Sequence, residues 1–223
     1  IKAGNKGLII TGIDDINAHL LAYEINDLLK SLSFIKDELS LIRKGNDNDV
    51  LELVKDLNSG KVKGIIMCGV NPAYTLSNSE EFISGIKKAN FSVCFSMKND
   101  ETTSQSKWAA ASPHYFESWG DNEMVSGNFS LTQPTIRPLF NTMQFQDCLL
   151  NWMGSSENYY NVIRKNWEQN ILENVSWNQA LHDGFFKARS KKSVNKLKYN
   201  SLRSAELLSK VQSSGMELSL IHI

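Results

Sequence analysis

Polar residues that could contact a ligand follow two expected strands of the chain. Gly69-Val70-Asn71-Pro72 lies at the end of a strand expected over 63–70, and Asp100-Glu101-Thr102 directly follows a strand expected over 91–97. Ligands of open α/β sheets bind outside the carboxyl ends of the strands, so these side chains could reach one. Asn-Pro also initiates turns, and Asp, Glu and Thr also cap helices. The same residues could therefore be turns and caps alone.

Familiar catalytic signatures are absent from the sequence. It contains no G-x-S-x-G nucleophile elbow, no Walker loop, no H-E-x-x-H pair and no C-x-x-C. Cys68 and Cys94 fall in expected buried strands, and Cys148 falls on the apolar side of an expected helix. Free cysteine at such positions usually packs as a small apolar residue. We therefore predict no catalytic residue and no metal site in this chain, which leaves open whether it belongs to an enzyme.

The elements that must position these residues follow from the apolar pattern. Short apolar runs alternate with helical periodicity up to about residue 154, which predicts strands and helices at 6–11, 16–32, 50–60, 63–70 and 91–97. The connections are short enough for parallel crossovers. Residues 112–138 hold three of the four prolines and little periodicity, which predicts an extended or looping segment. Helical spacing resumes over 145–152 and 160–171. We predict an α/β fold with a mostly parallel sheet flanked by helices and a helical C-terminal part.

Composition excludes several classes of protein. The chain has 223 residues, of which 41% are hydrophobic and 22% are charged, as in ordinary globular domains. Its 24 basic and 24 acidic residues balance, so the charge does not favour a nucleic-acid partner. The sequence has no apolar run of the roughly 18 residues that a transmembrane helix needs.

The expected domains differ in charge. Residues 1–154 form the α/β portion, and residues 155–217 form a helical, basic extension. Within that extension and just before it ends, residues 187–210 carry eight basic residues and one acidic residue, typical of a solvated helix, a docking arm or an anionic-lipid contact. We expect residues 218–223 to be translated adapter sequence, and the chain to be an internal fragment of a longer protein.

Several motifs, taken in order, resemble one family. Gly69-Val70-Asn71-Pro72 resembles the strand-end G-x-N-P element of the molybdopterin oxidoreductases, and Asp100-Glu101-Thr102-Thr103 resembles their T/D-E-T-A element. The sequence HYFESWGD at 114–121, followed by QPTIRPL at 133–139, is more specific. It resembles the molybdopterin-oxidoreductase-like region of the large iron–sulfur subunit of bacterial alternative complex III. WNQALHDG at 177–184 is similar to a downstream element of the same family.

This resemblance implies a cofactor-less scaffold or docking portion of an iron–sulfur electron-transfer subunit. In the family, a pterin-enzyme-like domain without molybdenum precedes a ferredoxin-like domain that carries iron–sulfur clusters. We therefore expect no cofactor in this fragment and iron–sulfur clusters elsewhere in the full-length subunit. The resemblance also implies membrane association at the periplasmic face of the bacterial cytoplasmic membrane. The implied partners are the other subunits of a quinol-oxidising respiratory complex.

The alternative is a fragment of a genuine molybdopterin-dependent oxidoreductase. The resemblance would then imply that molybdopterin guanine dinucleotide is bound at its nucleotide end by Gly69, Asn71, Pro72, Glu101 and Thr102. Such a dinucleotide is a large anion that needs several donors, yet Arg137 is the only arginine between Lys44 and Arg164. This scarcity favours the cofactor-less hypothesis, whereas lysines such as Lys98 keep the alternative open.

Overall fold

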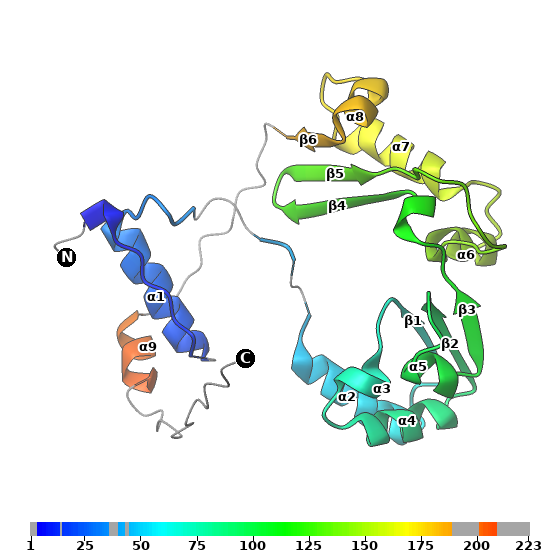
Figure 1. Cartoon of the computed structure of the whole chain (residues 1–223). Helices are drawn as coiled ribbons and strands as arrows, with labels where there is room; N and C mark the ends of the chain where they lie inside the picture. Colours follow the sequence, from blue (N-terminus) through cyan, green and yellow to red (C-terminus); the bar gives the residue numbers. More distant parts are fainter. Residues whose placement is uncertain (1–3, 14, 36–39, 43–44, 189–200, 209–223) are drawn as a thin grey trace, which may run out of the picture. The chain divides into compact units, whose positions relative to one another are not determined.

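The computed structural model describes residues 4–13, 15–35, 40–42, 45–188 and 201–208 (Figure 1). Contacts divide the chain into two compact units, one of residues 1–39 with 192–223 and one of residues 40–191. The domain boundary expected at residue 154 stays a prediction. Most of the basic tract and the expected adapter segment lie outside the described residues.

Helix α1 (Ile16–Leu29) confirms the helix expected in the first unit. Asp15 is its N-cap, and one of its carboxylate oxygens accepts hydrogen bonds from the backbone N–H groups of Asn17 and Ala18, at 2.7 and 3.2 Å. Such a cap satisfies donors that have no partner within the first helical turn. Helix α1 packs against α9 (Ser201–Leu208), and a short 3-10 helix (Gly4–Lys6) precedes it.

The strand expected over 6–11 is wrong. Residues 7–13 are irregular, and both backbone polar groups of Ile9 bond to the Asn26 side chain of α1, each at 2.8 Å. An apolar run forms a strand only where a neighbouring strand offers hydrogen-bond partners. Here a side-chain amide supplies both partners instead, so the run stays irregular.

A parallel three-stranded sheet, in the order β1-β2-β3, forms the first layer of the second unit (Figure 1). Two strands were expected, whereas β3 was not, because its run of alanines carries no apolar alternation. The elements of this layer are α2 (Asp47–Asn58), β1 (Gly64–Cys68), α3 (Pro72–Thr75), α4 (Ser79–Lys88), β2 (Phe91–Ser96), α5 (Glu101–Gln105) and β3 (Trp108–Ala111).

Helices α2 and α4 pack together and cover one face of this sheet. The core between them buries apolar side chains from helices and strands alike, among them Leu57, Ile86 and Cys94, which are fully buried. Gly85 lets the helices approach closely, because a Cβ built on it would lie 2.8 Å from the Leu57 Cβ. The opposite face carries Phe95, which is 2% exposed.

A second, antiparallel sheet corrects the expectation of a mostly parallel one. Residues 112–138, expected to be extended or looping, contain a β-hairpin that turns at Gly127, whose φ is 79°. A left-handed φ of this kind favours glycine. Strand order is β4-β5-β6, with β4 (Gly120–Val125), β5 (Asn128–Thr132) and β6 (Phe185–Lys187).

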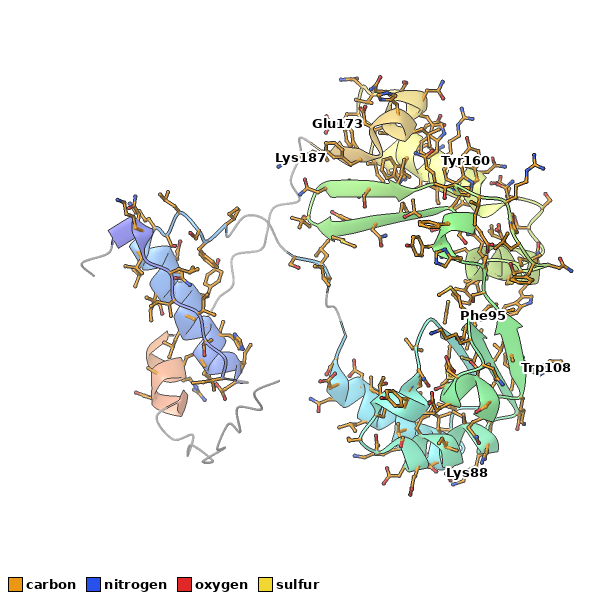
Figure 2. The ribbon with its side chains drawn as sticks, viewed as in Figure 1. Lys88, Phe95, Trp108, Tyr160, Glu173 and Lys187 are labelled. Carbon is orange, nitrogen blue, oxygen red and sulfur yellow. The ribbon has the colours of Figure 1, made fainter. Side chains whose placement is uncertain are left out.

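Helices of the C-terminal half agree with the expected helical periodicity. They are α6 (Phe145–Trp152), α7 (Tyr159–Asn170) and α8 (Trp177–Asp183). Helices α7 and α8 bury Trp167 and Trp177 against the antiparallel sheet. Helix α6 places Phe145 and Trp152 against the ring of Phe95, which Figure 2 labels on β2, with ring centroids 4.9 and 6.0 Å away. In the described part of the chain, no helix has the length and apolarity to cross a bilayer.

Candidate functional site

The candidate site lies at the carboxyl ends of β1 and β2. Gly69 ends β1 with a left-handed φ of 64°, and its N–H donates to the Phe95 carbonyl at 3.0 Å. Apart from Gly69 and its two chain neighbours, no atom of the described residues lies within 4 Å of the position where a Cβ would stand, so the backbone is open there. Pro72 begins α3 just beyond. The parallel crossovers bring the β1–α3 turn and the start of α5 together at one edge, as the sequence predicts.

Asn71, Glu101 and Thr102 bond to one another, and we call these three residues the Asn71 clasp. The Asn71 Nδ2 donates to Glu101 Oε2 at 2.7 Å. The Asn71 Oδ1 accepts from the backbone N–H and the hydroxyl of Thr102, at 3.1 and 2.7 Å. Thr102, which is fully buried, accepts in turn from the Ala73 N–H at 2.9 Å. The clasp therefore ties α5 to the turn after β1.

Two carboxylates at this edge are held in the charged form. The hydrogen bond from Asn71 lowers the pKa of Glu101 below its ordinary value. Desolvation raises the pKa of Asp100, but hydrogen bonds from Thr103 and Ser96 outweigh it and leave that pKa lowered. Asp100 is also the N-cap of α5 and accepts the Thr103 N–H at 2.8 Å. The edge is therefore negatively charged at neutral pH.

A cavity of about 460 Å³ opens beside the clasp, within the range of small-molecule sites. Both strand ends, the start of the 112–119 segment and the start of α6 contribute to its wall. Its apolar lining comes mainly from the side chains of Phe95, Met97, Tyr115, Trp119 and Phe145. Lys98 and Asp100 are the charged side chains among its described lining residues.

The described residues at this edge offer a pterin dinucleotide few cations and few helix N-terminal donors. Proteins bind a pyrophosphate with cations or with free N–H groups at a helix N-terminus. Lys98 is the one cation in the described lining, and the carboxylate of Asp100 lies in the same wall. The N–H groups of Thr102 and Thr103 at the start of α5 already bond to Asn71 and Asp100. Among the described lining residues, the low number of cations and the engagement of these two N–H groups favour a site without an anionic cofactor.

The other motif residues also form bonds within the fold. Glu117 accepts from the N–H groups of His114 and Leu139, both at 2.9 Å, and these two bonds lower its pKa. Asp121 accepts from the indole N–H of the buried Trp167 at 2.9 Å. This bond joins β4 to α7. The motif at 114–121 therefore stabilises the chain around the antiparallel sheet.

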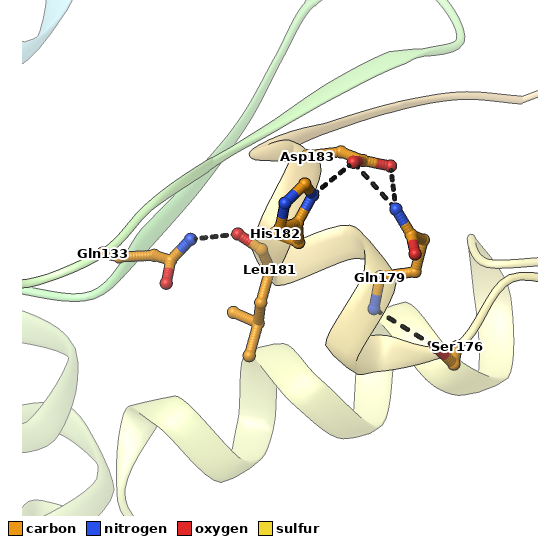
Figure 3. Close-up of polar contacts among 6 residues, drawn as sticks. All are labelled: Gln133, Ser176, Gln179, Leu181, His182 and Asp183. Carbon is orange, nitrogen blue, oxygen red and sulfur yellow. Dashed lines mark hydrogen bonds and ion pairs between the residues drawn. The ribbon is translucent and has the colours of Figure 1, made fainter.

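Helix α8 carries the last motif, drawn in Figure 3. The Gln133 side chain donates to the Leu181 carbonyl at 2.7 Å and so ties the segment after β5 to α8. Both carboxylate oxygens of Asp183 accept from the Gln179 Nε2 at 2.9 Å, and Oδ1 also lies 2.9 Å from the His182 Nδ1. The His182 side chain is 82% exposed. This group lies on the surface.

Of the two cysteines expected in buried strands, one is buried and one is exposed. Cys94 is buried, as predicted, and accepts a bond from the Thr103 hydroxyl at 3.4 Å. The buried position expected for Cys68 is wrong, because it ends an edge strand on the face that α2 and α4 leave uncovered. Desolvation raises the pKa of the Cys68 thiol, which makes it a poor nucleophile near neutral pH. Among the described residues, no three His, Cys, Asp or Glu side chains form a metal-binding group.

Sequence reasoning missed much of the cavity wall. Trp119 and Gln144 line it, and the Trp119 N–H donates to Gln144 Oε1 at 3.2 Å. Both residues lie in or beside the segment expected to be irregular, where periodicity carries no signal. Their role follows only from the long-range packing of α6 against β2.

Comparisons with known proteins show a structural likeness. No protein family model matches the chain, and no curated protein sequence matches it. Among solved structures, the chain is similar to acetylene hydratase from Pelobacter acetylenicus, with a TM-score of 0.49 and 14% sequence identity. The match covers 61% of this chain and 20% of that one, so the chain spans about a fifth of that protein's length. A likeness of this strength does not transfer an activity.

Proposed function

We propose that this chain is a cofactor-less scaffold and docking portion of an iron–sulfur electron-transfer subunit in a quinol-oxidising respiratory complex. The motif order resembles the large iron–sulfur subunit of bacterial alternative complex III. The observation that carries the proposal is the Asn71 clasp, in which the polar atoms of Asn71 bond to Glu101 and Thr102. Residues that would face a nucleotide in a pterin enzyme here tie α5 to the turn after β1.

The rest of the proposal comes from the same resemblance. Iron–sulfur clusters belong to another part of the full-length subunit, and the partners are the other subunits of the complex. The subunit is membrane-associated at the periplasmic face. The bonds of Glu117 and Asp121 support a structural role, because each fixes one segment of the chain against another.

Metal and pterin analysis of the full-length protein tests the proposal. The protein is purified from the cells that make it, and molybdenum, tungsten and iron are measured by mass spectrometry. Pterin is measured by fluorescence after oxidation of the denatured protein. We expect iron in stoichiometric amounts and neither molybdenum, tungsten nor pterin.

A molybdopterin enzyme purified from the same culture is the control, since it shows that the cells supply the cofactor. Stoichiometric molybdenum or tungsten together with pterin in the test protein would refute the proposal. That result would support the alternative, a genuine enzyme that binds molybdopterin guanine dinucleotide through Gly69, Asn71, Pro72, Glu101 and Thr102.

A further inference from the structure

Four oxidisable aromatic side chains lie in contact beside the antiparallel sheet. The ring centroids of Trp119 and Tyr160 lie 4.6 Å apart, those of Tyr160 and Trp177 lie 6.0 Å apart, and those of Trp177 and Trp167 lie 6.1 Å apart. Aromatic pairs at these spacings are in van der Waals contact. Indole and phenol rings also give up one electron more readily than the ring of phenylalanine. We call these four residues the aromatic row.

The contacts within the aromatic row suit electron transfer. Electron tunnelling slows exponentially with distance, so it is fast between rings in contact. The Trp177 indole N–H donates to the Tyr160 hydroxyl at 3.1 Å, which fixes this pair by a hydrogen bond as well as by packing. The Arg164 guanidinium lies beside the same hydroxyl. Because a neighbouring cation disfavours the removal of an electron from Tyr160, its ring bridges Trp119 and Trp177 and is not itself the site of oxidation.

The two ends of the aromatic row differ in exposure. Trp119 is half-buried and lines the cavity of the candidate site. Trp167 is fully buried in the core between α7 and the antiparallel sheet. A bulky oxidant at the cavity opening can therefore reach Trp119 but not Trp167.

The two ends also differ in charge. The Trp167 Nε1 donates to Asp121 Oδ2 at 2.9 Å, and the Tyr159 hydroxyl donates to the other oxygen at 3.4 Å. A carboxylate so close stabilises positive charge on the indole, the more so where little water screens it. An indole that has lost an electron is also a strong acid, and this carboxylate can accept its proton. Among the residues that the structure describes, no carboxylate hydrogen-bonds to the Trp119 indole.

We propose that the aromatic row moves oxidising equivalents from the cavity wall to Trp167. A one-electron oxidant takes an electron from Trp119, and an electron from Trp167 then passes through the two rings between them to replace it. The Nε1 proton of Trp167 moves to Asp121 Oδ2. The products are the reduced oxidant, a neutral indolyl radical at Trp167 and a protonated Asp121, and the indole on the cavity wall is restored. This inference goes beyond the proposed function and does not rest on it.

Site-resolved oxidation of the full-length protein tests the aromatic row. Tris(bipyridine)ruthenium(III), generated by light with a cobalt(III) ammine as electron acceptor, oxidises the native protein, and peptide mass spectrometry measures the oxidation products at each tryptophan. Trp108 and Trp152, which are 64% and 55% exposed, report the dose of oxidant. Asp121→Asn keeps a hydrogen-bond acceptor for Trp167 but removes the negative charge and the proton acceptor. We expect severalfold more oxidation at Trp119 in this variant than in wild type, with no change at the two exposed tryptophans.

Two controls separate electron transfer from altered access to Trp119. Glu117→Gln makes the same change two residues away, at a carboxylate that accepts from backbone N–H groups, and should leave the oxidation of Trp119 as in wild type. Hydroxynitrobenzyl bromide alkylates accessible indoles without electron transfer, and its rate at Trp119 should be equal in wild type and Asp121→Asn. Trp167→Phe removes the oxidisable end of the row and should also raise the oxidation of Trp119. Thermal unfolding of each variant shows that the assay samples folded protein.

Three results would overturn the aromatic row. These are unchanged oxidation of Trp119 in folded Asp121→Asn, an equal rise in Glu117→Gln, and a rise that the alkylation rate matches. The metal analysis is separate from this test. Pterin in a protein whose Trp119 responds as expected would refute the proposed function alone, and an unresponsive Trp119 in pterin-free protein would refute the aromatic row alone.

Discussion

Replacement of Asn71 by Ala removes the three hydrogen bonds at the centre of the Asn71 clasp. Two of them come from Thr102, which is fully buried in the native fold. The third goes to Glu101, whose carboxylate is exposed and can be hydrated instead. The loss of stability therefore comes mainly from the buried N–H of Thr102, which no longer has the Asn71 acceptor.

The expected loss of stability follows from that one group. Leaving a buried donor without a partner costs about 1–3 kcal/mol. In a unit of this size, each kcal/mol changes the melting temperature by about 2–4 °C, so a loss of about 2 kcal/mol lowers it by roughly 4–8 °C. All five tryptophans lie in residues 40–191, so tryptophan fluorescence of the full chain follows the unfolding of this unit.

Asn71→Asp separates the clasp from simple loss of volume. It keeps an acceptor for Thr102 but places a second carboxylate against Glu101, at the contact that now measures 2.7 Å. One of two such carboxylates takes up a proton at raised pH, so the variant's deficit against wild type should shrink as the pH falls from neutral to about 5. In wild type the pKa of Glu101 is lowered, so its stabilisation is present above the unfolded value of 4.5 and is lost as pH falls below it.

Asn170→Ala is the control for these variants. Asn170 forms an exposed hydrogen bond with Asn166 at 2.9 Å, and its replacement should change stability by less than about 0.5 kcal/mol. If Asn71→Ala melts within the error of this control, the clasp contributes nothing to stability. The residues would then be free to serve a ligand, and the scaffold argument would fail.

Three further substitutions or modifications test the packing. Gly85→Ala should destabilise the protein by about 1–3 kcal/mol despite better helix propensity, because its Cβ would lie 2.8 Å from that of Leu57; chemical denaturation measures this. Asp121→Ala should cost about 1–3 kcal/mol by leaving the buried indole N–H of Trp167 unpaired, whereas Asp121→Asn keeps an acceptor and should cost less in the same assay. Iodoacetamide should modify Cys94 only after unfolding, since its side chain is fully buried; intact-protein mass spectrometry detects modification, and labelling of the native chain there would contradict the packing.

The local pattern of apolar residues was sufficient to predict several helices and strands of this protein. The periodicity of apolar residues predicted α1, α2, α6 and α7, because a helix satisfies its backbone within itself and needs only one apolar stripe. The consecutive apolar residues of β1 and β2 likewise predicted two strands. The order of strands and crossovers also placed Asn71 and Glu101 at one edge, since parallel strands end on the same side of a sheet.

Only the tertiary structure decided which polar groups bond to which. The run over 6–11 stays irregular because Asn26 bonds to it, and Cys68 is exposed at the end of an edge strand. The sequence allowed Asn71 either to face a ligand or to bond within the chain. The folded structure commits it to Glu101 and Thr102, since hydrogen-bond partners far apart in sequence meet only once the sheet has formed.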